Sequence, residues 1–96
     1  MLLDSDRYEA VINYGKDAIN KLNEKELEEG FAAAEKGWDA FPESGAKWNQ
    51  GYNYAKMFYG RALQYHNMAI AKLWLDRMTE NNDTLHIFDF EIDHMK

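Results

Sequence analysis

The stretch Leu27-Glu-Glu-Gly-Phe-Ala-Ala-Ala-Glu-Lys-Gly-Trp-Asp-Ala-Phe-Pro42 decides the fold of this 96-residue chain. Its large and small apolar residues recur at steps of three and four, at Leu27, Phe31, Ala34, Trp38 and Phe41. That spacing places them on one face of an α-helix. The chain's single proline comes immediately afterwards and predicts the end of this helix.

Three further segments carry the same helical spacing. Their apolar positions are Tyr8, Val11, Ile12, Gly15, Ala18, Ile19 and Leu22; then Trp48, Tyr52, Ala55, Phe58, Tyr59 and Ala62; then Met68, Ala71, Trp74, Leu75 and Met78. Short breaks are expected at 23–24, where Asn23 can cap the second helix, at 42–45 and at 64–67. The polar run 80–83 predicts the end of the fourth helix, with Asp83 or Thr84 capping the next element.

The tail 85–96 fits two patterns. Leu85, Phe88, Ile92 and Met95 follow a helical stripe, whereas Phe88, Phe90 and Ile92 alternate as in a strand. A helix is the favoured interpretation, because a single strand has no partner for its backbone hydrogen bonds.

An internal repeat is visible when the chain is offset by 37 residues. Ala18 then falls on Ala55, Ala34 on Ala71, and the break after Phe41 on a break after Met78. Periods of this size are typical of stacked helical hairpins. The alternative is an irregular helical bundle in which the period is accidental.

The second helix of each unit carries a small residue, a large one four positions later and an apolar one three further on. These residues are Ala34, Trp38 and Phe41, then Ala71, Leu75 and Met78. The pattern resembles the second helix of a tetratricopeptide repeat over about residues 8–79. The expected fold is therefore all-α, with two stacked helix-turn-helix hairpins (about 6–41 and 46–79) and a C-terminal helix (84–96) in one domain, 1–96. The resemblance also implies a non-catalytic protein-binding scaffold whose groove is lined by the first helix of each unit.

Composition excludes several classes of protein. Apolar residues make up 46% of the chain, too many for a disordered segment. Cysteine is absent, so disulfides and thiolate metal sites are excluded. The uncharged apolar stretches are too short to span a membrane. Because Met1-Leu2-Leu3 runs directly into Asp4, no secretory signal is expected, and we predict a cytoplasmic protein.

The third helix is the first candidate binding surface. Residues 44–77 carry one acid and five bases among many aromatic side chains. The overall charge of −6 disfavours nucleic acid as a partner. A groove for an acidic or carboxylate-ended peptide is the better hypothesis, and its candidate residues are Trp48, Asn49, Tyr52, Asn53, Lys56, Tyr59 and Arg61.

The acidic first half suggests a different class of binding protein. Residues 1–43 hold eleven acids and five bases, and Glu28, Glu35 and Asp39 are candidates to meet a partner. Most such acids are the solvated side of amphipathic helices. A small acidic helical protein can also neutralise a basic toxin or nuclease, as immunity proteins and antitoxins do.

The tail and the histidines give the remaining hypotheses. If the tail is a helix, Ile87 and Phe90 would leave apolar surface uncovered, which predicts a homodimer or a partner bound at the tail, with Phe88 and Phe90 as candidate contacts. The alternative is a tail that folds back as a cap. His86, Asp89 and Asp93 have a permissible metal spacing, but solvated surface is the better interpretation, so no metal or cofactor is expected. Ser5 and Ser44 have no histidine at a meaningful spacing, so we do not expect an enzyme.

Overall fold

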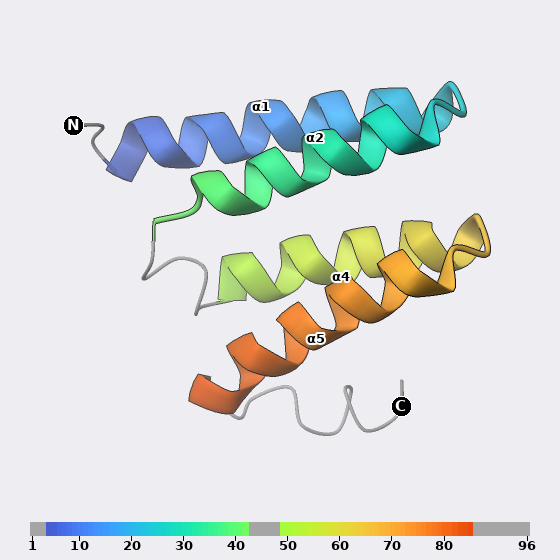
Figure 1. The fold of residues 1–96 in the computed structure, drawn as a ribbon. Coiled ribbons are helices and arrows are strands. Elements are labelled where there is room, and N and C mark those ends of the chain that lie inside the picture. Colours follow the sequence, from blue (N-terminus) through green and yellow to red (C-terminus); the bar gives the residue numbers. More distant parts are fainter. Residues whose placement is uncertain (1–3, 43–48, 86–96) are drawn as a thin grey trace. The chain divides into compact units, whose positions relative to one another are not determined.

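The computed structural model describes residues 4–42 and 49–85, and these residues form two helical hairpins (Figure 1). Helix α1 (Asp4–Asn23) packs against α2 (Leu27–Ala40), and α4 (Asn49–Gln64) packs against α5 (Met68–Leu85). The hairpins belong to two compact units, residues 1–42 and 43–96. The expected all-α class and both hairpins are confirmed over the described residues.

The first hairpin turns at a residue in the left-handed region, Lys25, with φ of 64°. The Lys25 amide donates to the Leu22 carbonyl at 3.0 Å, and the Glu26 amide donates to the Lys21 carbonyl at 2.8 Å. This pair of bonds is a Schellman motif, which satisfies carbonyls that the end of a helix leaves open. Glu26 then serves as N-cap of α2 without a side-chain hydrogen bond, so the predicted cap at Asn23 is wrong.

The second hairpin repeats this turn bond for bond. His66 has φ of 58° and its amide donates to Leu63 at 3.0 Å, while the Asn67 amide donates to Ala62 at 2.9 Å. Asn67 also caps α5, because its side-chain oxygen accepts from the Ile70 amide at 3.1 Å. The equivalent turn residues, Lys25 and His66, are 41 positions apart. The 37-residue offset therefore does not superpose the turns.

Helix α5 runs beyond the end that the sequence predicts. It continues through the polar run 80–83 and through Thr84 to Leu85. Asn, Asp and Thr are weaker helix formers than Ala by only about 0.7 kcal/mol or less each, and no Gly or Pro interrupts the run. The predicted break after Met78 and the predicted cap at Asp83 or Thr84 are both wrong.

Small residues let α1 and α2 approach closely. Val11, Gly15, Ala18 and Leu22 form the buried stripe of α1. A Cβ atom on Gly30 of α2 would lie 2.7 Å from Leu22 Cδ2 and 3.2 Å from the Leu22 amide nitrogen. At the other end of the hairpin, the Phe41 ring packs edge-on against Tyr8 and Trp38, with centroids 6.2 and 5.8 Å away.

Large aromatic rings fill the second hairpin instead. Tyr54 and Phe58 of α4 lie 5.9 and 5.4 Å from the fully buried Trp74 of α5, measured between ring centroids. The Arg77 guanidinium lies 4.5 Å from the centre of the Trp74 ring, within cation–π distance. The two hairpins thus have the same turn conformation, but different side chains pack between their helices.

We predict that Lys25→Gly and His66→Gly each stabilise the protein by about 1 kcal/mol, because glycine reaches positive φ without the Cβ clash. Urea unfolding, followed by circular dichroism, measures the change. The matched control is Lys36→Gly at an exposed position in the middle of α2. This change is expected to lower the free energy of unfolding by about 1 kcal/mol. Equal losses at all three sites would contradict the role given to the turns.

Gly30→Ala and Gly60→Ala should shift stability in opposite directions. Alanine is favoured over glycine by about 1 kcal/mol in a helix interior. At Gly60 of α4 a Cβ meets nothing within 4 Å, so the full gain is expected. At Gly30 the added Cβ overpacks Leu22, at a cost of about 1–3 kcal/mol, and a net loss is expected. Thermal unfolding of the two variants at low protein concentration tests both predictions. A clear gain in stability from Gly30→Ala would contradict the close contact between Gly30 and Leu22.

Candidate functional site

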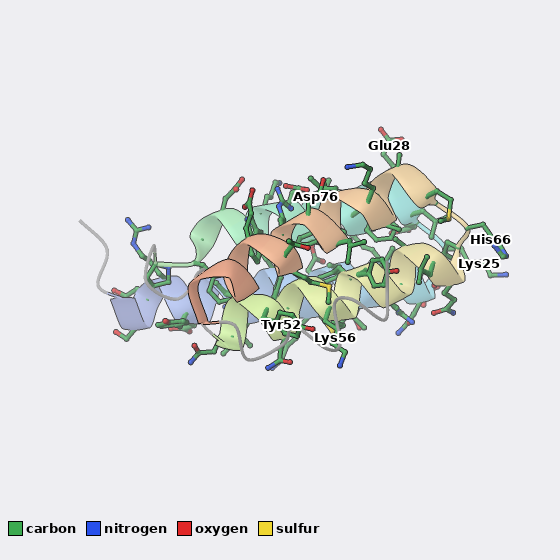
Figure 2. The ribbon with its side chains drawn as sticks, turned by 90° about the horizontal axis from the view of Figure 1, so that it is seen from below. Lys25, Glu28, Tyr52, Lys56, His66 and Asp76 are labelled. Carbon is green, nitrogen blue, oxygen red and sulfur yellow. The ribbon has the colours of Figure 1, made fainter. Side chains whose placement is uncertain are left out.

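Tyr52, Lys56 and Tyr59 share one side of α4, as their spacing predicts. They are four and three positions apart, so they lie within about 60° of rotation on a helix. Figure 2 shows Tyr52 and Lys56 on the same side of α4. Their burial differs, however: Tyr52 is 1% exposed, Tyr59 is half-buried and Lys56 is exposed. The surface that this stripe offers is therefore the Lys56 side chain and the edge of Tyr59, with Tyr52 in the core beneath.

Arg61 does not join the stripe. It follows Lys56 by five positions, which is a rotation of about 140° around the helix. Its Nη1 donates to the Gln64 side-chain oxygen at 3.4 Å, and its guanidinium lies 6.0 Å from the centre of the Tyr65 ring. Arg61 therefore lies on a different side of α4 from Lys56, because five positions is not a helical repeat.

The three candidate acids of α2 do share one side. Glu28, Glu35 and Asp39 stand seven and four positions apart, within about 40° of rotation, with the exposed Ala32 among them. Glu28 and Asp39 are exposed and Glu35 is half-buried. This acidic stripe lies opposite Gly30, which contacts α1, and Figure 2 shows Glu28 directed outward from α2. It extends for about 16 Å along the helix.

An acid–base pair lies on the surface of α1. Lys21 Nζ donates to Asp17 at 2.9 Å, one helical turn apart. This hydrogen bond raises the pKa of Lys21. Since the Lys21 pKa lies above its value in the unfolded chain, the part of the stability that depends on Lys21 is lost at alkaline pH, as Lys21 deprotonates. Both side chains of the pair are reached by solvent, so this contribution is minor.

Several candidates lie outside the described residues. These are Trp48 of the peptide groove, Phe88 and Phe90 of the predicted tail interface, and His86, Asp89 and Asp93 of the metal hypothesis. Among the residues that the structure does describe, no group of three His, Asp or Glu side chains could hold a metal ion. Within the same residues, no helix is long and apolar enough to cross a membrane.

One surface feature of α4 is not among the residues that the sequence pattern singles out. Met57 and Leu63 are both 38% exposed, and Gly60 lies midway between them. The three positions share the outer side of the helix, away from Phe58 and Ala62. Their spacing of three is visible in the sequence, but the core stripe next to them dominates the pattern.

We predict that Tyr52→Ala lowers the free energy of unfolding by about 3 kcal/mol, because a buried ring is removed. Lys56→Ala, one turn away on the same side, should change it by about 0.5 kcal/mol or less. Chemical denaturation of the two variants gives the comparison. Similar, small effects would show that Tyr52 contributes little to the core.

Comparison of the chain with protein families, with curated proteins and with solved structures finds no match. Function is therefore inferred from the residues of this chain and their arrangement.

Proposed function

We propose that the chain is a non-catalytic, tetratricopeptide-like module that binds a protein or peptide partner. The observation that supports the proposal most is the repeated turn: two helical hairpins closed by the same backbone bonds, with Lys25 and His66 in equivalent places. Duplicated helical hairpins are the building units of repeat scaffolds, whose extended surfaces bind proteins. The proposal also rests on fold analogy, which gives a class of function and no partner.

The binding surface in this proposal lies on α4 around Lys56. Lys56 and Asn53 are exposed and three positions apart, so an ammonium and an amide can reach one ligand. Both groups donate hydrogen bonds, and carboxylate oxygens accept them. The half-buried Tyr59 is three positions further along the same side of α4. A peptide ending in a carboxylate or carrying acidic side chains is the partner that fits this chemistry.

The acidic stripe of α2 favours a second candidate function. Glu28, Glu35 and Asp39 present carboxylates along about 16 Å of helix, and residues 4–42 carry ten acids against five bases. Such a surface complements a basic protein and speeds its association. In this alternative the chain is an immunity or antitoxin-type protein that neutralises a basic toxin or nuclease.

A capture experiment with charge variants distinguishes the two functions. Immobilised protein is exposed to native lysate at low and high salt, and bound proteins are identified by mass spectrometry. The peptide-binding proposal expects Lys56→Glu to lose at least tenfold of the captured material. The matched control, Lys36→Glu, makes the same charge change at an exposed position of α2 and should lose little of the captured material.

The acidic alternative expects the reverse result. Glu28→Gln, Glu35→Gln and Asp39→Gln combined should then abolish capture of one basic protein, with an association rate that falls steeply with salt. If neither set of substitutions changes the amount of captured protein, both proposed binding surfaces, the one around Lys56 and the acidic stripe of α2, are contradicted.

A further inference from the structure

Helix α4 is the only described helix that contains no acidic residue. It has two bases, Lys56 and Arg61, whereas α1, α2 and α5 each contain at least three acids. On the exposed side of α4, Asn53, Lys56 and Met57 lie within about 100° of rotation, and Met57 is 38% exposed. Among the described helices, α4 therefore offers the surface best suited to a segment that carries both acidic and apolar side chains.

Residues 86–96 have this composition. They contain three acids and one base, and the acids alternate with large apolar residues in the run Phe88, Asp89, Phe90, Glu91, Ile92 and Asp93. The segment lies outside the described residues, and it is joined to α5 at Leu85. The first hairpin, with ten acids and five bases over 4–42, repels such a segment, whereas the two bases of α4 attract it.

The topology of the second hairpin brings Leu85 close to the beginning of α4. Helices α4 and α5 pack against each other and are joined by residues 65–67, so they run in opposite directions. With lengths of about 24 and 27 Å, α5 ends near the level at which α4 begins. Lys56 is seven residues further along α4, a distance of about 10 Å. The eleven residues of 86–96 span about 16 Å as a helix and about 36 Å as a strand, so they reach Lys56 in either conformation.

We propose that residues 86–96 bind α4 beside Lys56 as an internal ligand and compete there with an external acidic peptide. A carboxylate of the segment accepts a hydrogen bond from Lys56, and an apolar side chain next to it covers Met57. Because the segment belongs to the same chain, its effective concentration is about millimolar, so a contact smaller than a stable complex needs is sufficient. The competition rests on the proposed function of this surface, whereas the docking of the segment does not.

Chymotrypsin cleavage after Phe88 and Phe90, followed by mass spectrometry of the full chain, tests the docking. Lys56→Glu should speed this cleavage at least fivefold, because a docked segment is protected and the reversed charge releases it. The matched control Lys36→Glu makes the same charge change on α2 and should leave the rate unchanged. Asp89→Lys, Glu91→Lys and Asp93→Lys combined should reverse the order, so that the segment is cleaved more slowly with Glu at position 56 than with Lys. A general loss of stability would not produce this reversal.

A synthetic peptide with the sequence of residues 86–96 tests the competition. It should bind the combined variant Asp89→Asn, Glu91→Gln and Asp93→Asn at least tenfold more tightly than the original chain. Equal cleavage of the original chain and Lys56→Glu would overturn the proposal, and so would protection that increases with protein concentration, because a second copy would then hold the segment. Protection that depends on Lys56, with capture from lysate that does not, would contradict only the proposed function. The opposite pair of results would contradict only the internal ligand.

Discussion

Each hairpin depends on one residue that is held at positive φ where glycine would be easier. Lys25 and His66 have φ of 64° and 58°, a region that costs an L-residue about 1–2 kcal/mol. The conformation persists because two backbone hydrogen bonds close each turn and the next helix begins at once. Without that reversal the apolar face of α1 could not meet α2, nor that of α4 meet α5. In each hairpin, the turn therefore sets the direction in which the second helix packs against the first.

The same turn leads to two different interiors because equivalent positions carry different residues. Leu22 and Gly30 of the first hairpin correspond to Leu63 and Ala71 of the second, 41 positions later. Leu22 is fully buried at a place where a Cβ on residue 30 would overlap it. Ala71 carries that Cβ, so Leu63 cannot occupy the equivalent place, and it is 38% exposed. Phe58 and Trp74 fill the second interior instead.

Periodicity alone predicted the helices and the approximate positions of the turns, because apolar spacing near 3.6 depends on burial, and burial dominates helix stability in proteins. It could not predict the turn conformation, since neither Lys25 nor His66 signals a left-handed residue. The sequence pattern also predicted that α5 ends too early, because the weak helix formers in the polar run 80–83 were interpreted as a break.

The candidate site was less predictable for a related reason. Spacing alone identified the stripe of Tyr52, Lys56 and Tyr59, but it left Tyr52 as both a core position and a binding candidate, and the structure buries its ring. Arg61 was grouped with these residues by its place on the same helix, although the five positions from Lys56 to Arg61 turn it to a different side of α4. Burial and direction depend on which neighbours pack against each helix, and the sequence of one helix does not contain that information.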